Sequence, residues 1–198
     1  MTHALTIQDL ARDPVQLTAQ LHAGDGSAFT ARVLCAEDAG ALGRYFDGLG
    51  QSVRGVYGPH PLNSAHATVL CAELDYNHLL PFVAVHDDDI IGYFLVQIGL
   101  RDGDRKRYID HGDPLIDQAC CTFAPCVTDA WQERGLGSAL FPHVAQSLRR
   151  LGRQRLVLWG GVRGDNPRAQ HFYRKFGFRH VGNFKVRDLD NLDMVLDL

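Results

Sequence analysis

A run of closely spaced glycines at residues 132–138, with the sequence QERGLGS, has the residue types that can bind an anion. A strand-like stretch at 118–127 precedes the run, and a helix-like stretch begins within it, so the run would form the turn between them. The first N–H groups of a helix have no partner inside the helix, and the helix dipole makes this end positive. Gly135 and Gly137 lack a Cβ, so a phosphate could approach the backbone closely. The run predicts a phosphate site, although a plain strand–loop–helix connection has the same pattern.

A second run, NPRAQHFYRKFGF at 166–178, has the signals of a short capped helix. Asn166 can cap its N-terminus, Pro167 suits its first turn, and Gly177 suits its C-terminal end. A strand-like stretch at 155–162 precedes it. The second run therefore predicts another strand followed by a helix.

Together, in this order and spacing, the two runs resemble the GNAT superfamily of acyl-CoA-dependent N-acyltransferases. The first matches the family pattern Gln-x-x-Gly-x-Gly, which holds the pyrophosphate of coenzyme A. The second matches Asn-x-x-Ala-x-x-Phe-Tyr-x-x-x-Gly-Phe, which flanks the pantetheine arm. The resemblance is specific over about residues 118–184 and looser before them, where 32–39 and 75–76 also look like the catalytic domain of bacterial protein-lysine acetyltransferases. It implies an N-acetyltransferase that takes its acetyl group from acetyl-CoA.

The resemblance also implies which residues hold the cofactor. Backbone groups of Cys126 and Val127 would pair with the pantetheine arm like an added strand, and the Val127 N–H would face the thioester oxygen. The side chain of Arg134 would add charge, or it is a solvated surface residue, while Asn166 would bond the pantetheine amide or only cap its helix. The pyrophosphate would lie on the main chain of the glycine run, which comprises Gln132, Arg134, Gly135, Leu136, Gly137 and Ser138.

The implied reaction is attack of an amine on a thioester carbonyl, and its leaving thiolate needs a proton. Tyr173 is the expected donor, because a tyrosine at this position lies beside the sulfur in the family. A phenol with a pKa near ~10 can protonate a thiolate whose conjugate acid has a pKa near ~8.5. The alternative is a packing role, since Phe172, Phe176 and Phe178 surround Tyr173.

The general base is not fixed by the sequence. Some family members carry a glutamate on the strand before the glycine run, but the corresponding position here is Cys121. A chain of water molecules is one alternative. The side chains that could act instead are two acidic candidates and three histidines, namely Glu73, Asp75, His86, and the loop residues His60 and His111. No Cys/His spacing suggests a metal site.

Hydrophobic periodicity predicts the elements that position these runs. A hairpin is expected over 15–35 with its turn at 24–26, then helices at 36–49 and 65–74, and strands at 80–85 and 90–99. The helix after the glycine run carries an apolar stripe, and Pro142 is expected to kink it. Strands at 178–186 and 192–198 end the chain, and the charged segment 101–117 is expected to be irregular. The stripe consists of Leu136, Leu140, Val144, Leu148 and Leu151.

In this order the elements predict an α/β fold with a mixed, mostly antiparallel sheet and helices on both faces, which is also the GNAT order. The 198 residues fit a single domain, with about residues 1–28 as an N-terminal extension or hairpin arm.

The composition limits the partners. A net charge of −3 gives no reason to expect nucleic acid or an anionic membrane. No apolar run is long enough to span a bilayer, and the five cysteines form no Cys-x-x-Cys pair, so reduced thiols and a cytoplasmic location are expected. The expected partners are acetyl-CoA, without a metal, and a small-molecule or protein amine. A homodimer through the C-terminal strands is an option that the resemblance suggests.

Two other functions compete with acetyl transfer. A non-catalytic acyl-CoA-binding or regulatory module on the same fold would explain the cysteine at position 121. A nucleotide-binding domain of another type is disfavoured, because residues 132–138 lack the Gly-Lys-[Ser/Thr] ending of a P-loop.

Overall fold

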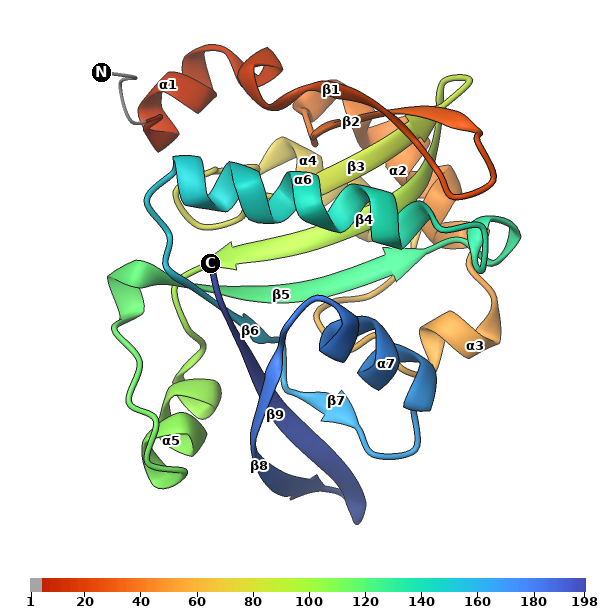
Figure 1. Cartoon of the computed structure of the whole chain (residues 1–198). Helices are drawn as coiled ribbons and strands as arrows, with labels where there is room; N and C mark the ends of the chain where they lie inside the picture. The colour runs from red at the N-terminus through yellow and green to blue at the C-terminus, as the bar shows by residue number, and fades with distance from the viewer. Residues whose placement is uncertain (1–4) are drawn as a thin grey trace.

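The computed structural model describes residues 5–198, and a nine-stranded sheet runs through this part of the chain (Figure 1). Its strands lie in the order β1-β2-β3-β4-β5-β6-β9-β7, and β8 also pairs with β9. The sheet is mixed and mostly antiparallel, as predicted, with β5 and β6 as the parallel pair among the described strands. The strands are β1 (Ala19–His22), β2 (Ala28–Val33), β3 (Phe82–His86), β4 (Asp89–Ile98), β5 (Cys120–Val127), β6 (Arg155–Leu158), β7 (Val162–Arg163), β8 (Arg179–Val186) and β9 (Leu189–Asp197).

Helices cover both faces of the sheet. In Figure 1, α6 (Leu136–Arg150) crosses in front of the strands, and α2 (Ala39–Asp47) and α4 (Ser64–Ala72) lie behind them. Strand β4 contributes to both cores, because Phe94 packs on the side of α6 while Tyr93 and Leu95 pack on the side of α2 and α4. The remaining helices are α1 (Ile7–Arg12), α3 (Gln51–Arg54), α5 (Asp102–Asp110) and α7 (Pro167–Lys175), with 3-10 turns η1 (Pro14–Leu17), η2 (Ala36–Asp38), η3 (Asp117–Ala119) and η4 (Asp129–Trp131).

The apolar stripe predicted for the helix after the glycine run is buried. All its members lie in the core on the α6 face: Leu136, Leu140, Val144, Leu148 and Leu151. The helix continues through Pro142, which has no N–H to donate to the preceding turn. None of the described helices is both long and apolar enough to cross a membrane.

Strand β6 pairs with only the first part of β5. The parallel register runs from Cys120 opposite Arg155 to Phe123 opposite Leu158, and the Trp159 N–H then donates to the Phe123 carbonyl at 2.9 Å. β5 continues to Val127 beyond this point, so its last residues have no strand on that side. The prediction of one strand over 155–162 was wrong, because two consecutive glycines with φ of +63° and +72°, Gly160 and Gly161, turn the chain between β6 and β7.

The N-terminal hairpin is shorter than predicted. Its turn at 24–26 is where the sequence places it, but the first arm begins at Ala19. Residues 14–17 form a 3-10 turn, in which Val15 is 69% exposed and Leu17 is buried. Proline at the start of that turn has a fixed φ and no N–H to offer a neighbouring strand, which explains the difference.

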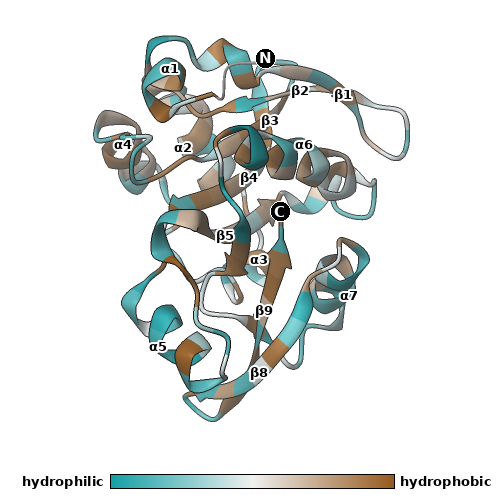
Figure 2. Ribbon diagram, turned by 60° about the vertical axis from the view of Figure 1, so that its left-hand side comes forward, coloured by the Kyte–Doolittle hydropathy of each residue, from teal (hydrophilic) through white to brown (hydrophobic). Residues whose placement is uncertain are grey.

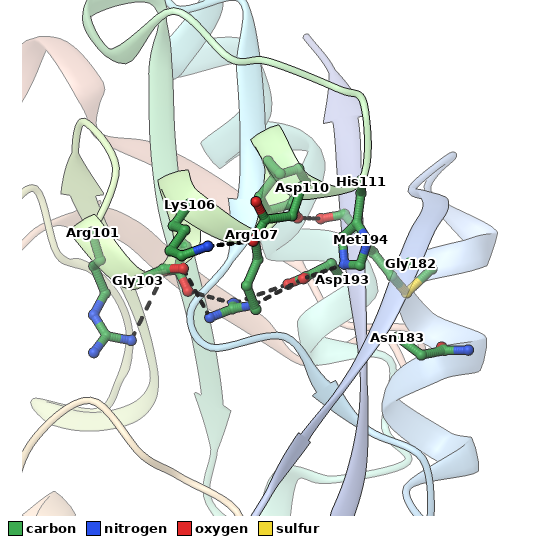
Figure 3. Close-up of polar contacts among 12 residues, drawn as sticks. Arg101, Gly103, Lys106, Arg107, Asp110, His111, Gly182, Asn183, Asp193 and Met194 are labelled. Atoms are coloured by element: carbon green, nitrogen blue, oxygen red, sulfur yellow. Dashed lines mark hydrogen bonds and ion pairs between the residues drawn. The ribbon is translucent and has the colours of Figure 1, made fainter.

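The segment 101–117 contains helix α5, so the expectation of an irregular segment was wrong. The helix is polar, mostly teal in Figure 2, and therefore lacks the apolar periodicity that identifies a helix in a sequence. It is held against β9 by charge instead. Arg107 binds both carboxylate oxygens of Asp193, at 2.9 and 3.0 Å, and also binds Asp104 at 2.6 Å (Figure 3). Both carboxylates are fully buried.

Candidate active site

The glycine run forms the predicted connection between β5 and α6. Helix α6 begins at Leu136, and its first internal hydrogen bond runs from the Ala139 N–H to the Gly135 carbonyl at 3.0 Å. The earlier N–H groups, those of Leu136, Gly137 and Ser138, have no acceptor among residues 5–198. Three unpaired donors at the positive end of a fifteen-residue helix make an anion site.

Gly135 is fixed by its conformation and by a close neighbour. Its φ is +80°, and a Cβ built on it would lie 2.7 Å from the backbone nitrogen of Gly24 in the β1–β2 turn. Gly137 differs, because a Cβ there would make ordinary contacts of 3.4 Å or more. The turn of the N-terminal hairpin therefore packs directly on the glycine run.

We expect Gly135→Ala to weaken coenzyme A binding at least ~10-fold and to lower the free energy of unfolding by about 2–3 kcal/mol, because it adds both strain and a backbone clash. Gly26→Ala is the matched control. Gly26 has a φ of +88° but no atom within 4 Å of a built Cβ, so it should lose about 1 kcal/mol and keep its affinity. Calorimetric titration measures the affinity for coenzyme A, and urea unfolding measures the free energy of unfolding. Equal losses in Gly135→Ala and Gly26→Ala would contradict the role of the contact with Gly24.

The side chain of Arg134 also binds the hairpin turn. Its Nε lies 2.5 Å from Asp25 Oδ2, its Nη2 donates to Ser27 Oγ at 2.8 Å, and its guanidinium stacks over the Trp131 ring at 3.8 Å. The backbone N–H of Ser27 and the Arg134 guanidinium lower the pKa of Asp25 to about 2. Arg134 is thus neither a freely solvated side chain nor a free cation, and it connects the glycine run to the hairpin.

The open edge of β5 lies next to this anion site. The Thr128 N–H donates to Ile91 of β4 at 3.3 Å, so Val127, one residue earlier, directs its backbone to the opposite edge, where β6 has ended. The Gln132 side chain donates to the Val127 carbonyl at 3.0 Å. The Cys126 carbonyl faces the other way and accepts from the Tyr45 hydroxyl at 2.8 Å. Of the two residues expected to pair with the pantetheine arm, only Val127 presents backbone to the gap.

Helix α7 brings the second run against the first. Lys175 donates to Ser138 Oγ at 3.0 Å, and Arg168 donates to Gln132 Oε1 at 2.7 Å. Asn166 caps the helix, since its Oδ1 accepts from the Ala169 N–H at 3.1 Å. The two runs are about thirty residues apart in the sequence, and these side-chain contacts join them into one surface.

Tyr173 lies on α7 and packs between aromatic rings. Its ring centroid is 5.5 Å from that of Phe172 and 5.2 Å from that of Phe178. Its hydroxyl has no hydrogen-bond partner among residues 5–198, and burial raises its pKa. The phenol is thus protonated at neutral pH. The ring packs in the core, and the hydroxyl remains uncommitted.

A pocket of about 230 Å³ lies on the opposite face of the sheet. Leu95 of β4 and Trp159, directly after β6, line it near the place where β5 and β6 part. The other lining residues come from the segment before α4, from α4 and from the residues that follow it: Pro59, His60, His66, Val69, Leu70, Glu73 and Leu79. No group of three or more His, Cys, Asp or Glu residues is arranged to hold a metal in the described part of the chain.

The model of the Acetyltransferase (GNAT) family matches residues 52–178. The chain belongs to this family. No curated protein matches the sequence.

Solved GNAT structures share the fold. The GNAT domain of S. lividans PAT has a TM-score of 0.75 at 21% identity, covering 93% of this chain and 99% of that one. Mycobacterium smegmatis RimJ in complex with CoA-disulfide has a TM-score of 0.67 at 16% identity, with 91% and 86% covered. The aminoglycoside acetyltransferase AAC(6')-Ib in complex with coenzyme A has a TM-score of 0.64 at 20% identity, with 84% and 93% covered.

The candidate bases of this GNAT chain lie in different places. Cys121, which stands where some family members carry a glutamate, is buried in the α6-side core, and this burial raises the pKa of its thiol to about 12. Asp75 lies in an exposed turn, where the backbone and side chain of Asn77 donate to it and lower its pKa.

Among the histidine candidates, His86 pairs with the Ala28 carbonyl at 2.8 Å. His111 lies 3.4 Å from Asp193 beside α5. Glu73 and His60 are the candidates that line the pocket.

Sequence reasoning did not single out His66 or Trp159. Asn63, whose Oδ1 accepts from the His66 N–H at 2.8 Å, is a readable helix cap that places His66 in the first turn of α4. No sequence pattern around His66 indicates that this turn lies near the end of β6, because the two segments are far apart in the chain.

Proposed function

We propose that this GNAT acetyltransferase transfers the acetyl group of acetyl-CoA to a primary amine. The observation that carries the proposal is the junction of the two motif runs, where the unpaired N–H groups at the start of α6 lie beside the open edge of β5 and α7. Coenzyme A would lie with its pyrophosphate on the main chain of residues 134–138 and its pantetheine arm along β5. Asn166 keeps its amide NH₂ group for the pantetheine arm, since its cap uses only Oδ1.

In the proposed reaction the amine nitrogen attacks the thioester carbonyl and forms the new C–N bond, while the C–S bond breaks. The Val127 N–H stabilises the oxyanion, and a base takes the proton that the amine loses. Tyr173 gives its proton to the leaving thiolate. Free coenzyme A and an N-acetylated amine are the products.

Incubation with acetyl-CoA and a panel of amines tests the proposal, with free thiol as the readout. We expect amine-dependent thiol release and, by mass spectrometry, one added acetyl group on the accepted amine. Glu73 faces the pocket and its replacement by glutamine should alter the KM for a cationic amine more than the affinity for coenzyme A.

The cysteine at position 121, where some family members carry a glutamate, favours a second candidate, a non-catalytic acyl-CoA-binding module. This module would bind coenzyme A without amine-dependent release of thiol over the whole panel. The same assay therefore separates the two functions.

A further inference from the structure

The pocket under α4 lies on the side of the sheet away from the coenzyme A surface. Leu95 belongs to the core that α2 and α4 cover, whereas Tyr173 and Leu136 belong to the core under α6 and α7. Strands β5 and β6 separate after the pair of Phe123 and Leu158, and Trp159, the next residue of the chain, lines the pocket. The pocket therefore borders the point at which the edge of β5 becomes open, and the thioester is proposed to lie along that edge.

The lining of the pocket is mostly apolar. Proline, valine, leucine and tryptophan side chains form six of its nine residues, and the formal charge comes from Glu73 alone. Such a pocket fits an amine with one positive charge on an apolar body. A polyamine or an aminoglycoside carries several cations, each of which would need a carboxylate or water when buried.

His60 and His66 form the polar wall of the pocket. Their rings stack with centroids 4.5 Å apart. His60 is fully engaged: its Nδ1 lies 2.9 Å from the Pro61 carbonyl and must donate to it, and its Nε2 then accepts from the hydroxyls of Tyr57 and Tyr93, at 3.1 and 3.2 Å. Burial lowers the pKa of His60 to about 4, so this ring stays neutral.

His66 differs from its neighbour. Its Nε2 is buried and has no hydrogen-bond partner among the described residues. An unsatisfied ring nitrogen costs free energy unless a ligand or water satisfies it. The titratable groups around it are His60 and, at the end of α4, Glu73.

We propose that this pocket binds the acceptor, an amine with a single cation on a compact apolar or aromatic body, and that His66 Nε2 takes the proton the amine loses. The inference rests on the proposed acetyl transfer. His66 Nε2 first takes one proton from the bound ammonium group, which leaves a neutral amine. The amine nitrogen then attacks, so that the C–N bond forms and the C–S bond breaks, and Tyr173 protonates the leaving thiolate. The second proton of the amine passes from the new amide nitrogen through solvent to the Tyr173 oxygen. His60 is a positioning residue that holds the His66 ring by stacking.

The test compares His66→Gln with the wild-type chain, using 2-phenylethylamine and spermidine as probes. The wild type should acetylate 2-phenylethylamine with at least ~10-fold higher kcat/KM than spermidine. His66→Gln should lower kcat for 2-phenylethylamine by ~10²-fold and leave the affinity for coenzyme A unchanged. The defect should shrink as pH rises towards the pKa of the amine, because the free amine then needs no base; a structural defect would not recover in this way.

His78→Gln is the matched control, since His78 is an exposed histidine shortly after α4 whose Nε2 lies 3.6 Å from Asp75 Oδ2 and which does not line the pocket. Its kcat should equal that of the wild type. Binding is read separately from turnover by the fluorescence of Trp159, which 2-phenylethylamine should change in the wild type but not in Trp159→Phe.

The outcomes distinguish the proposals. An unchanged kcat in His66→Gln overturns the role of His66, and a preference for spermidine overturns the assignment of the acceptor, while both leave acetyl transfer standing. Absence of turnover with every amine, in a chain that binds coenzyme A, overturns the proposed function and this inference with it.

Discussion

Replacing Tyr173 by phenylalanine should lower kcat by ~10²–10⁴-fold and leave the affinity for coenzyme A unchanged. The substitution removes only the hydroxyl, which is the atom proposed to protonate the thiolate. The ring contacts with Phe172 and Phe178 remain. Because no described residue bonds this hydroxyl, the free energy of unfolding should change by less than about 0.5 kcal/mol. Thiol release at saturating acetyl-CoA and urea unfolding measure the two quantities.

Tyr108→Phe is the control for this prediction, because it should lower the stability and leave kcat unchanged. The Tyr108 hydroxyl is buried on α5 and donates to the Met194 carbonyl at 2.7 Å. Its loss should cost about 1–2 kcal/mol of stability, because the carbonyl is left unsatisfied, and should leave kcat unchanged. A Tyr173→Phe variant with wild-type kcat would rule out the proton-donor role and leave Tyr173 as a packing residue.

Replacing Arg107 by methionine should destabilise the protein by about 3–5 kcal/mol. Arg107 is the cation between Asp104 and Asp193, and both carboxylates are fully buried (Figure 3). Methionine keeps much of the side-chain volume, including the contact with the Phe184 ring, but leaves two buried carboxylates without their main partner. The midpoint of urea unfolding should fall accordingly.

Lys106→Met is the control for this prediction. Lys106 is the preceding residue on α5, and it is exposed and pairs at the surface with Asp110 at 2.7 Å. Surface pairs of this kind contribute little, so the change should stay within about 0.5 kcal/mol. Similar losses in both variants would mean that the buried network does not hold α5.

The sequence predicted the elements whose signals are local. The glycine run, the cap at Asn166 and the stripe on α6 each depend on residues within a few turns of one another, and the structure has them where they were expected. Two expectations were wrong for physical reasons. Buried ion pairs hold α5 in place of an apolar face, and two glycines with positive φ end β6 early.

The candidate site was only partly predictable, because several of its contacts join segments that are far apart in the sequence. Arg134 binds Asp25, 109 residues earlier in the chain, and no pattern around either residue indicates this pair. The pocket combines residues from 59–79 with Leu95 and Trp159, so the presence of His66 and Trp159 in one pocket depends on the fold. The two acidic candidates also could not be told apart from the sequence. Glu73 and Asp75 lie two residues apart, but of the two only Glu73 lines the pocket.

The contact between Gly24 and Gly135 has a consequence for how motif boundaries are interpreted. The family match begins at residue 52, yet the turn that packs on the glycine run belongs to a hairpin that ends before residue 52. A fragment trimmed to the matched region would keep both motif runs. It would lose the hairpin turn that packs on the glycine run at Gly135. The region that the family model matches is therefore smaller than the region that determines the shape of the glycine run. If the run binds coenzyme A as proposed, substitutions in the hairpin should alter cofactor affinity even though they lie outside the match.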